Sequence, residues 1–150
     1  MQIIESYVIG LATETTNLNG RAAKDLSTLW ERFYTEDIST EITTKVSDDI
    51  YSIYTDYESD YSEKYTCIIG HKVNSLASIP EGCVGRKFNS GNYHRFVAKG
   101  EIPNAVLATW ESIWKSEPSL NRKYTSDFEI YGIKSQDGAN SEVEIYIATE

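Results

Sequence analysis

An internal repeat is the feature that most restricts how this 150-residue chain can fold. The pattern Trp-Glu-x-(Phe/Ile)-aromatic occurs at residues 30–34 and again at residues 110–114, an offset of 80. Residues 51–54 correspond in the same way to residues 128–131, at an offset of 77. A repeat determines the architecture before any shorter motif is considered, so we expect two copies of one structural unit.

The first copy is predicted to contain a strand, a helix and two further strands. Helical spacing of apolar residues predicts an amphipathic helix that begins at Arg21 and ends near Asp37. Residues 38–49 are expected to form a loop, which could hold a short strand at residues 42–46. The strands, recognised by β-branched and aromatic residues, are expected at residues 6–13, 50–55 and 65–73, with an acidic turn at residues 56–63.

The second copy is predicted to repeat this order. Pro103 suits the first turn of a helix, where its missing N–H would have no partner, and Pro118 is expected to stop that helix. Residues 90–92 contain a glycine within a β pattern, which indicates a bulge or a bend. The expected strands are residues 84–88, 93–98, 127–133 and 143–149, with a turn at residues 135–140.

Two βαββ units that each bury one helix against a sheet predict an α+β fold with pseudo-twofold symmetry. We expect antiparallel sheets, with two helices that flank a central ligand cleft. In the cleft equivalent positions should face each other, which places Ser52 opposite Glu129. The whole chain is expected to form a single domain, with repeat one at about residues 2–73, a connector at residues 74–83 and repeat two at about residues 84–149.

The strand predicted around residues 126–132 carries the most conspicuous side chains. Successive side chains of a strand point to opposite faces, so Glu129 and Tyr131 share one face if Phe128 and Ile130 pack into an apolar layer on the other. We expect a ligand on the face of Glu129. A buried carboxylate needs a partner, so Glu129 either meets a cationic ligand, pairs with a nearby Lys or Arg, or lies at a solvated sheet edge.

Charge and composition narrow the classes of function. A net charge of -9 and a pI near 4.7 argue against direct nucleic-acid binding, because phosphate contacts need clustered Lys and Arg. Nine of the 23 acidic residues lie between Glu36 and Glu63, which we interpret as a solvated loop region. No basic leader and no apolar stretch of about 18 residues occurs, so a cytoplasmic protein without membrane contact is expected. His71 and His94 lack metal-ligand spacing, and no metal site is predicted.

Short segments spread over essentially the whole chain form a further pattern. These are Ile79-Pro80-Glu81-Gly82, Ser90-Gly91-Asn92-Tyr93 with Phe96 and Gly100, the helix with Trp110 and Ile113-Trp114, Asp127-Phe128-Glu129-Ile130-Tyr131, and residues 143–147. In this order, on a duplicated frame, they resemble the GyrI-like family. That family is the small-molecule effector-binding domain also found in AraC/Rob-type and MerR-type multidrug-responsive activators.

The resemblance implies a central aromatic cleft with a carboxylate, which binds lipophilic cations in the drug-responsive members. Glu129 stands at the matching position, and Glu144, in a second Glu-Ile-Tyr triplet, ranks second with a structural role. We predict a stand-alone effector-binding-type domain that senses or sequesters a lipophilic, cationic small molecule without a cofactor. Ligand contacts are expected from Glu129, Trp110, Trp114, Tyr54, Tyr131, Tyr93, Phe33, Tyr51 and Tyr146.

The resemblance also carries two alternatives. Some stand-alone members of similar size hydrolyse strained cyclopropanoid compounds, and in that case Glu129 would act as general base while Tyr54 or Tyr131 donates a proton. The family's name-giving member inhibits a DNA-processing enzyme, so a separate protein partner that meets the acidic stretch from Glu36 to Glu63 is a weaker alternative.

Overall fold

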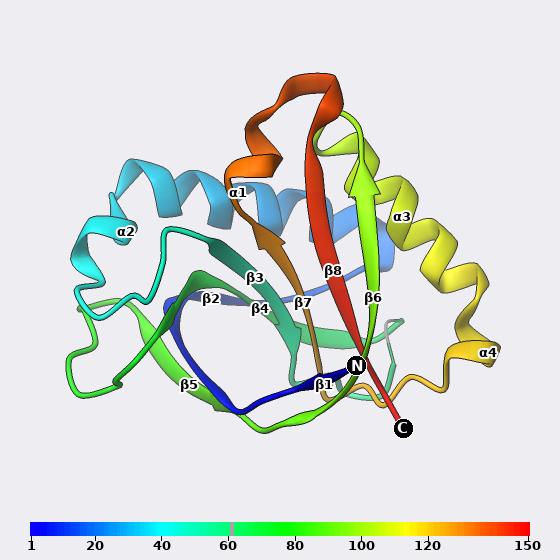
Figure 1. Cartoon of the computed structure of the whole chain (residues 1–150), viewed down its shortest axis with the longest axis horizontal. Helices are drawn as coiled ribbons and strands as arrows, with labels where there is room; N and C mark the ends of the chain where they lie inside the picture. The colour runs from blue at the N-terminus through cyan, green and yellow to red at the C-terminus, as the bar shows by residue number, and fades with distance from the viewer. Residues whose placement is uncertain (61) are drawn as a thin grey trace.

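A single, strongly curled antiparallel sheet carries two long helices against one of its faces (Figure 1). The structure is a computed structural model that describes every residue except 61 and, for residue 118, only the backbone. The eight strands of the described chain are β1 (Gln2–Ile3), β2 (Ser6–Thr16), β3 (Ile50–Thr55), β4 (Lys64–Val73), β5 (Val84–Phe88), β6 (Gly91–Lys99), β7 (Ser126–Tyr131) and β8 (Glu142–Thr149). The helices are α1 (Arg21–Thr35), α2 (Ile38–Glu41), α3 (Asn104–Lys115) and α4 (Glu117–Leu120).

The strand order confirms the duplicated βαββ frame. The order is β1-β6-β8-β7-β3-β4-β2-β5, and exchanging β1–β4 for β5–β8 gives the same order read backwards. The predicted antiparallel strands form one continuous sheet, because β3 and β7 pair along their length and join the two halves. The residue limits of the two repeats, at about 2–73 and 84–149, stay a prediction.

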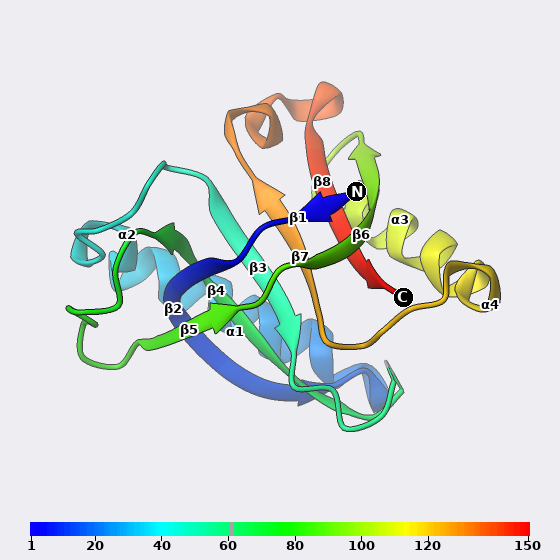
Figure 2. The same ribbon diagram turned by 60° about the horizontal axis from the view of Figure 1, so that its bottom comes forward.

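The first strand of each half pairs with the other half. β1 pairs with β6, and β5 pairs with β2 (Figure 2). The chain runs on from β1 into β2 and from β5 into β6, so each half holds the edge of the other. The bend expected at residues 90–92 lies where the chain leaves the β2 side and joins β8. Strand exchange of this kind makes the two halves one structural unit.

Each long helix buries an apolar stripe against the outer strands of its own half. Ala22, Leu29 and Phe33 are the buried residues of α1, which packs on β2 and β4. Val106, Trp110 and Ile113 are the buried residues of α3, which packs on β6. The two stripes belong to separate hydrophobic clusters. The central strands β3 and β7 therefore lie between the helices rather than beneath one of them (Figure 1).

The opposite face of the sheet carries its own apolar layer. Phe128 stacks on Tyr146 at 4.9 Å between ring centroids, and Ile130 packs against the same cluster. Ile53 belongs to the adjoining cluster on this face. Phe128 and Ile130 thus point away from Glu129, as the alternation of the predicted strand requires.

One element missed by the local pattern is α2, which occupies part of the predicted loop at residues 38–49. Ile38 and Ile42 are 2% and 1% exposed and both join the core beneath α1. Because they lie four residues apart, one helical turn brings both to the same side. The short strand considered at residues 42–46 reduces to an isolated bridge between Lys45 and Val73.

Other boundaries moved because distant pairing decides where strands end. β1 carries no local signal and depends on β6, while β2 extends to Thr16, which pairs with Lys64. β7 ends at Tyr131, since Ile133 is 87% exposed in a following 3-10 turn. α3 already ends at Lys115, and Pro118 falls within α4. The acidic turn predicted at 56–63 includes residue 61, which lies outside the described residues. No described helix is both long and apolar enough to cross a membrane.

Candidate ligand-binding site

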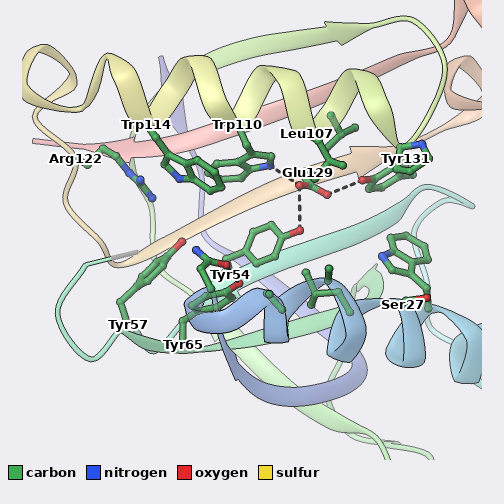
Figure 3. Close-up of a pocket in the computed structure, with 18 residues that line it drawn as sticks. Ser27, Tyr54, Tyr57, Tyr65, Leu107, Trp110, Trp114, Arg122, Glu129 and Tyr131 are labelled. Atoms are coloured by element: carbon green, nitrogen blue, oxygen red, sulfur yellow. Dashed lines mark hydrogen bonds between the residues drawn. The ribbon is translucent and has the colours of Figure 1, made fainter. Parts of the chain in front are cut away.

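A cavity of about 670 Å³ opens between α1 and α3, above the central strands β3 and β7 (Figure 3). Apolar and aromatic side chains make up most of its wall, with few polar groups. The lining residues are Asn17, Gly20, Ala22, Ala23, Leu26, Ser27, Trp30, Tyr54, Tyr57, Tyr65, Pro103, Val106, Leu107, Trp110, Trp114, Arg122, Glu129 and Tyr131. The cavity lies where the duplicated frame predicts a central cleft.

Glu129 is the buried acid of this cavity, with 2% of its surface exposed. Its Oε2 accepts hydrogen bonds from the indole N–H of Trp110 at 2.6 Å and from the hydroxyl of Tyr54 at 3.0 Å. Its Oε1 accepts one from the hydroxyl of Tyr131 at 2.7 Å (Figure 3). Three neutral donors from three elements therefore hold one carboxylate in place.

No cationic side chain compensates the charge of Glu129 among the ion pairs of the described residues. Burial raises the pKa of Glu129 above its ordinary value of 4.5, because desolvation disfavours the charged form. The hydrogen bonds from Tyr131, Trp110 and Tyr54 act in the opposite direction and lower the pKa, but by less. The site can therefore hold either a proton or an external cation.

The two phenols beside Glu129 both donate to its carboxylate. Burial raises the pKa of Tyr54 and of Tyr131 well above the ordinary value of 10.0, and the neighbouring Glu129 raises both further. Each hydroxyl therefore keeps its proton and offers it to the carboxylate. Of Glu129 and these two phenols, Glu129 is therefore the group that can carry a negative charge.

The aromatic wall follows the internal repeat. The ring of Tyr54 packs edge-on against Trp110, at 5.6 Å and 86°, and the ring of Tyr131 packs edge-on against Trp30, at 5.0 Å and 75°. Tyr54 and Tyr131 correspond at the offset of 77, and Trp30 and Trp110 at the offset of 80. Trp30 was absent from the predicted ligand contacts, although the repeat that pairs it with Trp110 contained the signal.

The pseudo-twofold axis passes through the pair Ser52 and Glu129. These residues are direct cross-strand partners in the β3–β7 ladder, and they also correspond at the offset of 77. Ser52 is fully buried, and its hydroxyl donates to the hydroxyl of Tyr54 at 3.3 Å. In this ladder, Ser52 and Glu129 are the one pair of facing residues that are also equivalent in the repeat. One half of the chain therefore supplies a serine at this position, and the other half supplies an acid.

Five of the predicted contact residues are brought together by the cavity, and four lie elsewhere. The wall includes Glu129, Trp110, Trp114, Tyr54 and Tyr131. Phe33 lies in the core between α1 and the sheet, because it occupies the stripe that faces β2 and β4. Tyr51, Tyr93 and Tyr146 alternate to the opposite face of the sheet and pack in the clusters around Phe128.

Glu144, which was expected to have a structural role, lies outside the cavity and pairs with Arg95. The guanidinium of Arg95 donates to its carboxylate from Nε at 2.9 Å and also from Nη2. Both side chains are more than a third exposed. Its neighbour Ile145 points into the core beneath α3, so Glu144 lies on the face away from the cavity.

The end of the cavity beyond Trp114 holds residues that the sequence pattern did not indicate. Arg122 is buried there and donates to Asp127 at 2.7 Å. The hydroxyl of Tyr57 also donates to Asp127, at 2.6 Å, and its ring lies 5.5 Å from that of Tyr124. These residues come from loops, whose positions local periodicity does not predict. No group of three or more His, Cys, Asp or Glu within the described part of the chain is placed to hold a metal.

Comparison with protein families places this geometry among effector-binding proteins. Residues 4–149 match Cass2, the integron-associated effector binding protein family. YobU of Bacillus subtilis strain 168, described as a candidate transcriptional regulator, is 27% identical over 142 residues. That alignment covers 93% of this chain and 89% of YobU.

Solved structures share the architecture over the whole chain. The integron cassette protein VCH_CASS2, from the mobile metagenome of Vibrio cholerae, is 32% identical, with a TM-score of 0.77 over 100% of this chain and 94% of its own. SAV2435 bound to tetraphenylphosphonium has a TM-score of 0.82 at 19% identity, over 100% of this chain and 92% of SAV2435. The C-terminal domain of EcmrR has a TM-score of 0.67 at 16% identity, over 100% and 94%. The last two likenesses concern the fold.

Proposed function

Because this chain belongs to the Cass2 family of integron-associated effector binding proteins, we propose that it binds a lipophilic cation in the cavity between α1 and α3, with Glu129 as counter-ion. Family membership confirms the predicted class, an effector-binding domain related to transcription regulators. The proposal adds the chemical class of the ligand and the residue that selects it.

The single observation that carries the proposal is the buried carboxylate of Glu129, which has three neutral donors and no cationic partner among the described side chains. An ionised carboxylate in such a place is costly unless a cation compensates it. A monovalent cation about 4 Å away gains roughly 4 kcal/mol at an effective dielectric of 20. A lipophilic cation meets this need and also fills an apolar cavity.

The wall and the volume of the cavity suit such a ligand. A volume of about 670 Å³ lies within the roughly 300–1,000 Å³ of typical small-molecule sites. The rings of Trp30, Trp110 and Trp114 offer aromatic surface to a cation, worth about 0.5–2 kcal/mol for each good contact. The tetraphenylphosphonium bound to SAV2435, a structure with the same fold, is a ligand of this chemistry.

The geometry favours binding over the hydrolase alternative. A general base needs a free lone pair aimed at a water, whereas three hydrogen bonds leave Glu129 only one of the about four acceptor positions of a carboxylate. A proton donor needs a pKa near the working pH, whereas burial and Glu129 raise the pKa of Tyr54 and of Tyr131. Incubation of the protein with cyclopropyl carbonyl compounds, followed by product analysis, tests the alternative directly.

The decisive variant is Glu129→Gln, which keeps the shape of the side chain and removes its charge. We expect the affinity for tetraphenylphosphonium to fall about a hundredfold, since the roughly 4 kcal/mol attraction is partly offset by the relief of burying a charge. Affinity for the neutral triphenylphosphine oxide should change less than about threefold. Isothermal titration calorimetry and ligand-induced shifts of Tm measure both.

Glu144→Gln is the matched control, because Glu144 begins a second Glu-Ile-Tyr triplet but its side chain is exposed, away from the cavity. It should leave both affinities unchanged. Equal loss of cation and neutral ligand in Glu129→Gln would contradict the assignment of Glu129 as counter-ion.

A further inference from the structure

The cavity holds a second buried polar group, the guanidinium of Arg122. Its side chain is 1% exposed. Nη2 donates to Asp127 at 2.7 Å, and Nη1 donates to Glu117 at 3.0 Å. The Nε–H is also buried but has no hydrogen-bond partner among the described residues. A buried donor without an acceptor is unfavourable, so native proteins seldom leave one without a reason.

The position of Arg122 places it in the wall that a ligand bound at Glu129 would contact. Both residues line the same cavity. Figure 3 shows Arg122 beside Trp114 at one end, with Trp110 between it and Glu129. The Cζ of Arg122 lies 6.0 Å from the ring centroid of Trp110, whose Nε1 lies 2.6 Å from Glu129. The two polar groups therefore lie on either side of one indole, within the span of a single small molecule.

The charges around Arg122 decide which kind of acceptor fits. Asp127 and Glu117 already place two carboxylates on the one guanidinium, and the side chain of Asp127 is fully buried. A ligand carboxylate would add a third negative group beside them, in a cavity that also contains Glu129. A neutral oxygen would satisfy the Nε–H without adding charge. The site therefore fits a neutral acceptor better than an anion.

We propose that the Nε–H of Arg122 forms a second subsite, which selects lipophilic cations that carry a neutral acceptor, such as a ketone, ester or ether oxygen, away from the charged centre. The inference rests on the proposed function, because the cation is held by Glu129. It adds a second polar requirement at the opposite end of the aromatic wall. Ligands that meet both requirements bind more tightly than cations of equal size that meet only one.

A matched pair of permanent cations tests the subsite. The probes are triphenylphosphonium ions with a phenylalkyl chain, and the same ions with the methylene next to the phenyl ring replaced by a ketone, compared over a series of chain lengths. At the best chain length the ketone should bind the wild-type protein about tenfold more tightly, as expected for one hydrogen bond from a charged donor. Isothermal titration calorimetry measures both affinities.

Arg122→Lys keeps a positive charge for Asp127 and Glu117 but has no N–H at the Nε position. The ketone preference should fall to about twofold or less, while the affinity for the alkyl probe persists and shows that the variant is folded. Arg95→Lys, an ion-paired arginine outside the cavity, is the control and should keep the full preference.

Distinct results overturn the two proposals. Equal affinity for ketone and alkyl probes at every chain length in the wild-type protein overturns the subsite, and so does a preference that survives Arg122→Lys. If Glu129→Gln still weakens both probes, the proposed function stands in either case. If the wild-type protein binds neither cation, the proposed function fails and the inference fails with it.

Discussion

The two walls of the cavity are built alike, although they come from different halves of the chain. Tyr54 packs edge-on against Trp110 on one side, and Tyr131 packs edge-on against Trp30 on the other. On each helix an aromatic residue four positions further on contacts the Trp, Trp114 at 6.2 Å from Trp110 and Tyr34 at 6.0 Å from Trp30, but of these two Trp114 alone lines the cavity. The duplicated frame thus repeats the aromatic surface.

The walls differ in what they do for the acid at the axis. Trp110 donates its indole N–H to Glu129 (Figure 3), whereas Trp30 contacts Tyr131, and no hydrogen bond joins its indole to Glu129 among the described residues. The position equivalent to Glu129 in the other half holds Ser52. Because only one half contributes a negative charge, the cavity is nearly symmetric in shape but asymmetric in electrostatic potential. The following predictions test that difference, beginning with the largest expected effect.

The pH dependence of cation binding should report the charge of Glu129 directly. Since burial raises the pKa of Glu129 above 4.5, the empty site is protonated at pH values between 4.5 and the raised pKa. Tetraphenylphosphonium does not titrate, so its affinity should rise about tenfold per pH unit below the raised pKa and level off above it. Calorimetric titrations at several pH values measure the curve, and Glu129→Gln should flatten it. An affinity of the wild-type protein that does not change with pH would contradict the role of ionised Glu129 as counter-ion.

The free energy of unfolding of the ligand-free protein should change with pH in the opposite direction to the cation affinity. A carboxyl whose pKa is raised by folding binds its proton more tightly in the folded state, so the free energy of unfolding falls as pH rises from 4.5 through the folded pKa. In Glu129→Gln this contribution is absent, and the difference in stability between variant and wild type should grow over that window. Urea unfolding at each pH provides the measurement. A difference that stays constant with pH would show that the pKa of Glu129 is not raised.

The equivalent tyrosines should separate in their effect on Glu129. Tyr131 donates to Oε1, at 2.7 Å, while Tyr54 shares Oε2 with Trp110. Tyr131→Phe should therefore raise the pKa of Glu129 by about one unit, and Tyr54→Phe by less, because each lost bond had favoured the charged form. The midpoint of the pH curve for cation binding measures the shift. Equal shifts would mean that the two halves support the acid equally.

Trp30 and Trp110 occupy equivalent positions on α1 and α3, but substituting them should affect the pKa of Glu129 differently. Trp110→Phe removes a donor to Glu129 and should raise the pKa of Glu129, by less than Tyr131→Phe does. Trp30→Phe removes only indole surface, so the midpoint should stay in place while affinity falls about twofold at every pH. Similar midpoints for the two variants would contradict the role assigned to Trp110.

Much of this arrangement could be predicted because it depends on local rules. Alternation along the strand placed Glu129 and Tyr131 on one face and Phe128 on the other, and the structure has them so. The same alternation puts Tyr51 on the face of Ile53, away from the cavity, although Tyr51 was predicted as a ligand contact. The repeat likewise contained the pairing of Trp30 with Trp110. The positions of both residues therefore follow from local rules.

Other features depend on contacts between distant segments. Arg122 and Tyr57 reach the cavity from loops, and both meet Asp127 only after the sheet has formed. Part of the predicted loop forms α2, because Ile38 and Ile42 pack into the core beneath α1. Local periodicity carries no information about such partners.

The amino-acid sequence by itself determined the duplicated frame, the class of domain and the identity of the acid at its centre. These follow from repeat spacing, from strand alternation and from a resemblance spread over the whole chain. The predicted meeting of Ser52 and Glu129 is also seen in the sheet. Only the tertiary structure decided that Glu129 pairs with no described cation, and that Arg122 lies at the other end of the same wall. The reason is physical: burial, desolvation and cross-strand pairing arise between residues far apart in the chain, so they exist only once it has folded.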